Sequence, residues 1–380
     1  MTIRSLLATI VGLCVSSTHA QPPTTNPPAH NVILVMIDGL RWQEVFRGAE
    51  RALISKEHGK VEKEQPVLDA YWRDSPEERR QALLPFLWGI VARQGVILGN
   101  RDRGSLGRTE NPHWFSYPGY SEVLCGFPDD RIDSNRKVPN PNTTVFEWLN
   151  AKEPYRGRVA GFGGWDVFPF ILNTMRSGIP VDDSIVPFTA GTITPGLETI
   201  NKVKTEIPRR WASANFDAIV FRTAMEWIPA NTPRVVFLGQ GETDEWAHEG
   251  DYEQYLRAAR RVDGFLAELW AFLQHHEFYR GRTAMLITCD HGRGDGAVFP
   301  EKGMKDWNNH GAKHPGSDQV WLAAIGAGIP STGEASDGEF TLAQTAATLA
   351  HLLGEDWNAA EPRAARPLGT IVWATTPVTP

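Results

Sequence analysis

The chain has 380 residues, of which 41% are hydrophobic and 22% are charged. This composition is that of a globular protein with ample material for a core, and it excludes disorder as the default state. The formal net charge is -7 and no long run of one charge occurs, so the composition gives no indication of a nucleic-acid-binding surface.

Residues 1–20 predict a signal peptide. Arg4 precedes an apolar stretch over Leu6–Val15, and the small residues Thr18 and Ala20 follow it. A membrane-spanning helix needs about 20 apolar residues, roughly twice what this stretch offers, so we expect cleavage near Ala20 rather than an anchor. The mature protein is then expected to be secreted or periplasmic, without a transmembrane segment.

Cleavage would remove Cys14 and leave Cys125 and Cys289, which excludes a disulfide scaffold. Each remaining cysteine lies within an apolar run, so we expect two buried thiols rather than one bridge. Residues 21–30 contain four prolines and predict a solvated linker, and residues 373–380 predict a frayed tail.

From residue 31 onward, strand-like apolar runs alternate with amphipathic helix-like runs. Strands are predicted at Val32–Ile37, Val96–Leu98, Arg158–Phe162, Arg234–Leu238, Ala284–Thr288 and Val320–Ile325. Helices are predicted at Glu77–Arg93, Val145–Ala151, Ala212–Trp227, Tyr252–His275 and Leu342–Leu353. This alternation predicts an α/β fold, a three-layer sandwich in which helices cover a largely parallel central sheet.

Three of the predicted strands run out into acids and histidines. The residues concerned are Asp38, Asp244, His248, Asp290 and His291. A lone acid after a strand is more often a helix cap or a surface partner, but open α/β sheets build their sites at the carboxyl ends of strands. Asp244 and His248 are four residues apart, which places both on one face of a helical turn, as chelation of one ion requires. The repetition therefore favours a metal site.

His310 completes a set of three aspartates and three histidines. It lies in a polar turn and is followed by Gly311, before the strand predicted from Val320. His314 is the competing choice, and spacing alone leaves the two nearly balanced. We prefer His310 because of its tighter turn.

Ser116 is the candidate nucleophile. Pro118 suits the first turn of a helix, which places Ser116 at or next to the helix N-cap, with backbone N–H groups and the helix dipole aimed at a bound anion. An ordinary capping serine would look the same, so the predicted metal ligands decide in favour of the catalytic interpretation.

These motifs resemble those of the alkaline phosphatase superfamily, most closely its type I phosphodiesterase/nucleotide pyrophosphatase branch. The resemblance covers nearly the whole mature chain and agrees in motif order and spacing. Many members of that branch have threonine where this chain has Ser116. The motifs that carry it are Val35–Arg41, the segment that begins at Ser116, Asp244 with His248, Asp290–Gly292, and His310–Gly311.

The resemblance implies two divalent metal ions. Asp244, His248 and His310 would hold one ion, and Asp38, Asp290, His291 and the nucleophile Ser116 would hold the other. It also implies that Asn135 contacts a phosphoryl oxygen, although a turn residue would look the same. Imidazole and carboxylate ligands without thiolate suit zinc, with manganese or iron as alternatives.

The expected activity is that of an exported two-metal phosphohydrolase that cleaves small-molecule phosphate esters, either diesters or monoesters, through a phosphoserine on Ser116. Charge stabilisation is expected from Asn135 and the backbone N–H of Tyr117. The expected domains are a signal peptide at 1–20, a linker at 21–30, a single catalytic domain with an alkaline-phosphatase-like fold at 31–372, and the tail. Oligomeric state stays open.

Several rival functions remain. A sulfatase would have arginine where Tyr120 stands, and would not need a second metal set. A phosphosugar mutase does not fit export, and a phosphoethanolamine transferase would need a membrane domain. A pseudoenzyme that binds metal or phosphoester without turnover is the alternative from another class.

Two segments and one arginine bear on substrate specificity. The insertions Phe46–Leu98 and Phe168–Thr205 are expected to form the rim that selects the leaving group. Arg293 follows the Asp290–Gly292 motif and could contact substrate, but we expect it to pair with Asp295 or another surface acid.

Overall fold

The computed structural model describes residues 29–295 and 304–372. The predicted signal peptide with Cys14, the predicted linker up to residue 28 and the predicted tail at 373–380 lie outside the described residues. Within the described ranges, no helix is both long enough and apolar enough to cross a membrane.

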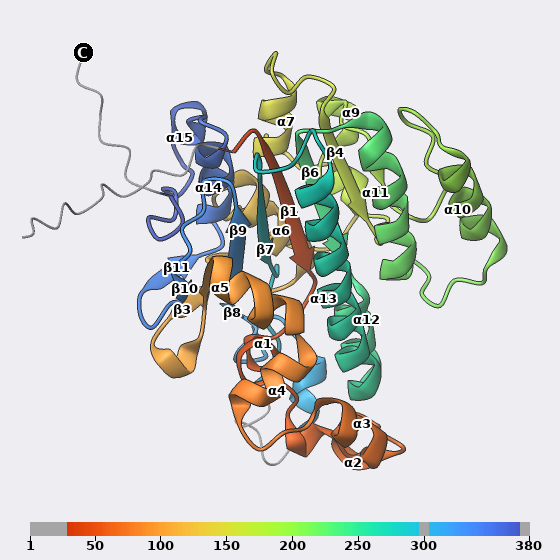
Figure 1. The fold of residues 1–380 in the computed structure, drawn as a ribbon, viewed down its shortest axis with the longest axis vertical. Helices are drawn as coiled ribbons and strands as arrows, with labels where there is room; N and C mark the ends of the chain where they lie inside the picture. The colour runs from red at the N-terminus through yellow and green to blue at the C-terminus, as the bar shows by residue number, and fades with distance from the viewer. Residues whose placement is uncertain (1–28, 296–303, 373–380) are drawn as a thin grey trace, which may run out of the picture.

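An eight-stranded sheet forms the centre of the molecule (Figure 1). Its strands, in spatial order, are β10 (Gly333–Glu334), β2 (Gly95–Leu98), β9 (Leu322–Gly326), β7 (Thr283–Thr288), β1 (Asn31–Ile37), β6 (Val235–Gln240), β4 (Val159–Gly163) and β5 (Val181–Asp182). Only β9 runs against its neighbours β7 and β2, and the other pairs are parallel. The predicted α/β class with a largely parallel sheet is confirmed.

The central strands are apolar along their whole length because both faces of the sheet are covered. Every residue of β1, β6 and β7 is buried, which is the pattern of parallel strands between two helical layers. The register places Ile37 beside Gln240 of β6, and Met36 beside Thr288 of β7. The three strands therefore end at nearly the same level.

Helices pack on the sheet in two groups, α11 with α13 and α6 with α7 and α14. Along α13, the apolar residues Leu256, Val262, Leu266 and Leu269 are buried. The helices are α1 (Trp42–Arg47), α2 (Lys56–Gly59), α3 (Glu64–Tyr71), α4 (Pro76–Leu83), α5 (Ala92–Gln94), α6 (Ser116–Cys125), α7 (Val145–Asn150), α8 (Phe168–Ile171), α9 (Thr174–Ser177), α10 (Pro195–Glu206), α11 (Asp217–Asn231), α12 (Glu242–Glu249), α13 (Tyr252–His275), α14 (Gln344–Leu352) and α15 (Trp357–Ala360).

The predicted helix Glu77–Arg93 is broken in two. α4 ends at Leu83 because Leu84 precedes Pro85, and a residue before proline avoids the helical region; Leu84 has φ -126 and ψ 65. A π-helical turn at Leu87–Val91 and the short α5 follow.

The predicted strand Val320–Ile325 belongs to two sheets. Its first part is β8 (Gln319–Val320), which joins β3 (Leu106–Arg108) and β11 (Glu339–Thr341) in a small three-stranded sheet. Its second part is β9. The strand breaks at the buried Trp321, whose Nε1 donates to the Leu40 carbonyl oxygen at 2.9 Å.

Two further expectations concern a helix and the cysteines. The helix predicted at Ala212–Trp227 begins later, because α11 spans Asp217–Asn231. Cys125 and Cys289 are both buried free thiols, so the expectation of two thiols rather than a bridge is confirmed.

Candidate metal centre and active site

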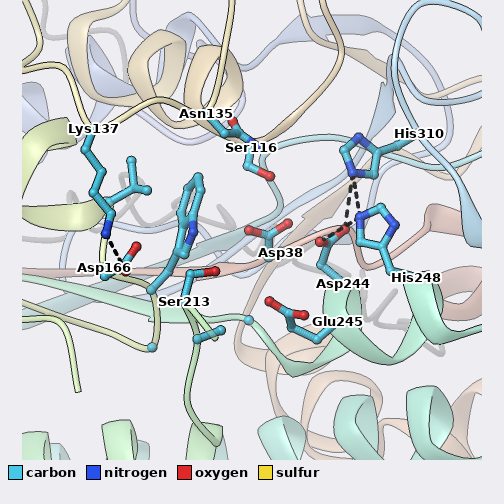
Figure 2. A pocket seen from close by; sticks show the side chains of 15 residues that line it. Asp38, Ser116, Asn135, Lys137, Asp166, Ser213, Asp244, Glu245, His248 and His310 are labelled. Atoms are coloured by element: carbon cyan, nitrogen blue, oxygen red, sulfur yellow. Dashed lines mark hydrogen bonds and ion pairs between the residues drawn. The ribbon is translucent and has the colours of Figure 1, made fainter. Parts of the chain in front are cut away.

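The predicted ligands Asp38, Asp244 and Asp290 lie beyond the carboxyl ends of three neighbouring parallel strands, and Figure 2 shows the first two of them. Asp38 directly follows β1, Asp290 lies two residues beyond β7, and α12 begins two residues after β6. Asp244 and His248 lie one turn apart on α12, with His248 Nε2 3.1 Å from Asp244 Oδ2. Adjacency of the strands thus brings residues more than 200 positions apart to one edge of the sheet.

Four side chains form a first group, which we call the first half-site: Asp38, Ser116, Asp290 and His291. His291 Nε2 lies 3.4 Å from each of Asp38 Oδ1, Asp290 Oδ2 and Ser116 Oγ. The other ring nitrogen, Nδ1, lies 2.8 Å from the Gly292 carbonyl oxygen. Since a carbonyl only accepts, Nδ1 carries a proton and Nε2 can turn its lone pair to an ion.

The two carboxylates of the first half-site are each held by one oxygen. Tyr120 donates its hydroxyl to Asp38 Oδ2 at 3.0 Å, and the Gly39 N–H donates to Asp290 Oδ1 at 3.1 Å. The remaining oxygens, Asp38 Oδ1 and Asp290 Oδ2, are buried without a hydrogen-bond partner. Buried oxygens of this kind are costly unless a cation binds them.

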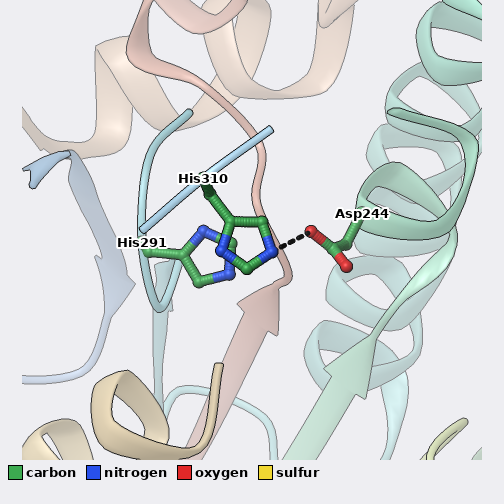
Figure 3. Close-up of side chains that lie close together, drawn as sticks. All are labelled: Asp244, His291 and His310. Carbon is green, nitrogen blue, oxygen red and sulfur yellow. Dashed lines mark ion pairs between the residues drawn. The ribbon is translucent and has the colours of Figure 1, made fainter. Parts of the chain in front are cut away.

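Asp244, His248 and His310 form the second half-site. His310 Nε2 lies 3.0 Å from His248 Nε2 and 3.6 Å from Asp244 Oδ1. Figure 3 shows His310 stacked on the His291 ring, at a centroid distance of 4.0 Å, with its Nε2 turned toward Asp244. The two half-sites are therefore in contact through the stacked rings of His291 and His310.

His314 is turned to a different partner. Its Nδ1 pairs with Asp306, in the 3-10 helix Met304–Asn308. The geometry therefore favours His310 over His314 as the last predicted ligand.

The donor atoms fit divalent metal ions, none of which is present in the structure. Tetrahedral ligands 2.0–2.1 Å from one zinc ion lie about 3.3 Å apart. Apart from the 3.6 Å between His310 Nε2 and Asp244 Oδ1, the separations in the two half-sites, 3.0–3.4 Å, bracket that value. Oxygen and imidazole donors without thiolate also suit zinc.

The electrostatics of the cluster also favour a bound cation. Burial raises the pKa of Asp290 well above its ordinary value, and the charge of Asp38 raises it further. Burial and the charge of Asp244 likewise raise the pKa of Asp38. Burial lowers the pKa of His291, but the charges of Asp290 and Asp38 outweigh this and raise it to about 9. The cluster has an excess of negative charge, which a divalent cation would neutralise.

Ser116 is the first residue of α6, directly after its N-cap Phe115. Pro118 lies in the first turn, as the sequence predicts. The Ser116 side chain is 5% exposed and lines the pocket of the site. Its hydroxyl is therefore fixed beside the first half-site rather than free on the surface.

The helix N-terminus offers fewer donors than the sequence suggested. The Tyr117 N–H donates to Asn135 Oδ1 at 2.9 Å, Pro118 has no N–H, and the Gly119 N–H bonds the Phe115 carbonyl at 3.1 Å. The expectation that Tyr117 donates directly to substrate is therefore wrong in this structure. Its N–H instead orients the Asn135 amide, so that Nδ2 is the donor left for a ligand.

Comparison with known proteins finds one family model and two curated relatives that this chain resembles. Residues 211–356, which include Asp244, His291 and His310, match the metalloenzyme superfamily. GPI ethanolamine phosphate transferase 1 of mouse is 31% identical over 307 residues, and that of human is 29% identical over 310 residues. Over residues 211–356, the chain is therefore similar to the metalloenzyme superfamily.

Solved structures agree on the fold. The alkaline phosphatase PafA superposes with a TM-score of 0.57 at 12% identity, covering 91% of this chain and 99% of that chain. The lipoteichoic acid synthase LtaP from Listeria monocytogenes gives 0.55 at 12% identity, covering 86% and 72%. These likenesses confirm the predicted alkaline-phosphatase-like architecture.

The sequence relatives bear on one rival function. Each match covers 80% of this chain and 27% of the relative, so the chain spans about a quarter of the length of the curated relatives it matches. The argument against a phosphoethanolamine transferase is that such an enzyme would need a membrane domain. That argument does not distinguish this chain from these relatives, because the match covers only part of each of them. The phosphodiesterase/nucleotide pyrophosphatase branch stays a prediction.

The pocket at the site has a volume of about 370 Å³ and extends beyond the predicted metal ligands (Figure 2). Its far wall comes from residues 164–167, which follow β4, and from Ser213 and Ala214. Neither predicted rim segment, Phe46–Leu98 or Phe168–Thr205, contributes a lining residue. Residues beyond the carboxyl end of β4 line the pocket instead, since β4 neighbours β6 in the sheet, and which segment selects the leaving group stays a prediction.

Several lining residues escaped the sequence analysis. Lys137, two positions after Asn135, pairs with Asp166 at 2.6 Å across this wall, and Glu245 lies next to Asp244. Asp166 could have been found from the sequence because it follows the predicted strand Arg158–Phe162. This is a fourth strand end, beside the three that carry the predicted metal ligands.

Arg293 is not a surface residue, so the expected pairing with a surface acid is wrong. Its side chain is fully buried, and Nη1 pairs with Asp244 Oδ1. Nε donates to the Trp307 carbonyl at 3.1 Å and Nη2 to the Asn308 carbonyl at 2.8 Å. A fixed cation therefore stands at the second half-site.

Proposed function

We propose that the protein is a two-metal phosphohydrolase that cleaves small-molecule phosphate esters through a phosphoserine on Ser116. The observation that carries the proposal is the convergence of the Ser116 hydroxyl with the unpartnered oxygens of Asp38 and Asp290 on one histidine nitrogen, each at 3.4 Å. A hydroxyl held beside an ion site is the arrangement that activates serine without a separate histidine base.

The metal ions would be held by the first half-site and the second half-site. When bound, they supply positive charge that stabilises the deprotonated nucleophile and neutralises phosphoryl oxygens. Zinc is the metal we propose, on the chemistry of the donors.

The chain's own residues set up the displacement. Ser116 Oγ gives its proton to solvent water and attacks phosphorus opposite the leaving oxygen, which takes a proton from water as its bond to phosphorus breaks. Asn135 Nδ2 is placed to donate to a phosphoryl oxygen, because Asn135 Oδ1 is already occupied by the Tyr117 N–H. Water then displaces Ser116 in a second in-line step, so configuration at phosphorus is retained.

The test compares p-nitrophenyl phosphate with bis-p-nitrophenyl phosphate as substrates of the zinc-loaded protein, with Ser116→Ala in parallel. We expect turnover of one or both, lost by at least about a thousandfold in Ser116→Ala, and a phosphoserine trapped by acid quenching and located by mass spectrometry. Faster diester cleavage would identify a phosphodiesterase and faster monoester cleavage a phosphatase. If neither is cleaved in a Ser116-dependent way, the proposal fails in favour of a sulfatase or a binding protein.

A transferase is the second candidate, because the sequence relatives are named as ethanolamine phosphate transferases. Hydrolysis and transfer share the first step and differ in what attacks the phosphoserine, water or an acceptor hydroxyl. With added ethylene glycol or glycerol, a hydrolase would release mostly phosphate, or the monoester when a diester is cleaved. A transferase would divert most of the product to the alcohol, which ³¹P NMR separates.

We also propose that the protein is exported, supported by the leader-like pattern of residues 1–20. N-terminal sequencing after expression in a bacterium with a periplasm would show a new N-terminus near Gln21. An intact Met1 in the cytoplasm would contradict export and would leave the proposed chemistry untouched.

A further inference from the structure

We propose that the two half-sites bind metal ions with different affinities, and that Arg293 weakens the second half-site. The inference rests on the metal centre of the proposed function, but it concerns how the ions load rather than the reaction. It follows from the charge, anchoring and exposure of the groups around the two half-sites.

The first half-site has two carboxylates, and among the described residues no arginine or lysine is paired with either of them. Within residues 29–295 and 304–372, the ion-pair partner found for Asp38 and Asp290 is His291, which must lose any proton on Nε2 to bind an ion. With an ion bound, the protein side therefore presents two negative charges. The side chains of Asp290 and His291 are fully buried, so that attraction is little screened by water.

The second half-site has one carboxylate, and Arg293 already pairs with it. The guanidinium occupies Asp244 Oδ1, which leaves Oδ2, 3.1 Å from His248 Nε2, as the oxygen free for an ion. The charges of Asp244 and Arg293 cancel, so the second half-site presents a net charge near zero. An incoming ion would also face a cation in close proximity.

Arg293 cannot swing away from this position. Its other two donor nitrogens are tied to the Trp307 and Asn308 carbonyls at 3.1 and 2.8 Å, and its side chain is fully buried. A guanidinium fixed by three partners keeps its geometry, unlike a surface lysine. The pairing with Asp244 is therefore a permanent part of the second half-site.

The backbone at the end of β1 makes room for the pair of Arg293 and Asp244. A Cβ on Gly39, the residue after Asp38, would lie 2.6 Å from Arg293 Nη1 and 2.9 Å from Asp244 Oδ1. Gly39 also has a φ of +60°, where a side chain is disfavoured. The glycine thus allows the Arg293 and Asp244 pair to approach the end of β1.

Exposure adds to the difference in charge. The His248 side chain is 45% exposed, whereas His291 is fully buried. An ion in the second half-site would therefore exchange with solvent more readily than one in the first. We infer an order of loading, with the first half-site filling before the second.

The test is a zinc titration of the metal-free full chain by calorimetry, with a competing chelator, and needs no substrate. We expect two steps, the second at least about tenfold weaker, which corresponds to about 1.4 kcal/mol. His248→Ala, a change at a partly exposed side chain, should remove the weaker step alone. Asp290→Asn should remove the tighter one.

Arg293→Gln removes the cation and should tighten the weaker step by about tenfold or more while leaving the tighter step within about threefold. Arg222→Gln is the matched control, because it removes an arginine charge from an exposed pair with Glu268 and should change neither step. Thermal melting of each metal-free variant shows whether it folds.

Equal affinities in the unaltered protein would overturn the proposal without any variant. So would an Arg293→Gln variant that folds but binds the second ion no more tightly. These outcomes are independent of the proposed function, because a protein without Ser116-dependent turnover can still show the two steps. Conversely, a turnover assay that succeeds says nothing of the order of loading.

Discussion

Asn135 offers a direct test of how the site stabilises charge. Its Oδ1 accepts the Tyr117 N–H at 2.9 Å, which leaves Nδ2 as the donor of an amide that lines the pocket together with Ser116. Asn135→Ala removes the donor. Asn135→Asp keeps an acceptor for Tyr117 but presents an oxygen to the phosphoryl group in place of an N–H.

The size of the effect follows from the position of Asn135. A donor in a water-excluded site is worth about 10²–10³ in kcat. Asn135 is exposed in the structure, so water competes for the phosphoryl oxygen and a smaller value applies. A hydrogen bond to a charged group contributes about 1.5–3 kcal/mol, which is about 10- to 150-fold in kcat/KM. Asn135→Asp should lose more, because a negative charge then faces the anionic substrate.

The assay is kcat/KM for whichever p-nitrophenyl ester the zinc-loaded protein cleaves, with Ser134→Ala as the matched neighbour that does not line this pocket. We expect unchanged thermal midpoints and the order Ser134→Ala near wild type, Asn135→Ala lower, and Asn135→Asp lowest. An Asn135→Ala variant within about threefold of wild type would refute the reasoning, as would an Asn135→Asp variant more active than Asn135→Ala.

Three further predictions concern stability and reactivity. Lys204 pairs with Asp182 at 2.8 Å, and both side chains are buried. Lys204→Met leaves the Asp182 charge unpaired and should lower the free energy of unfolding by about 3–5 kcal/mol in urea denaturation. The double variant Lys204→Met with Asp182→Leu should lose less, and an equal loss would contradict the prediction. Burial raises the pKa of Asp263 from 3.8 to about 6, so the folded state holds this proton more tightly than the unfolded state does. The free energy of unfolding of wild type, relative to that of Asp263→Asn, should therefore fall between pH 4 and pH 6 and level off above pH 6. A difference that does not change with pH would contradict this prediction. Burial raises the pKa of the Cys125 thiol to about 12, and Cys289 is also buried, so neither should react with Ellman's reagent until denaturant is added.

The order and type of the main elements could be read from the sequence because they depend on local pattern. Fully apolar runs such as Val32–Ile37 predict strands buried on both faces, and the acids that follow them are neighbours in the chain. Parallel pairing then brings the carboxyl ends to one edge, so Asp38, Asp244 and Asp290 could be expected to meet. The superfamily resemblance rested on these same motifs.

Other features depend on contacts between distant segments, which only the tertiary structure decides. The sequence left His310 and His314 balanced, and the fold separates them by pairing His314 with Asp306. Arg293 looks like a surface residue until the carbonyls of the loop before His310 and the carboxylate of Asp244 close around it. A buried charge needs partners, and whether they are present depends on how the segments pack rather than on the residues beside it in the chain.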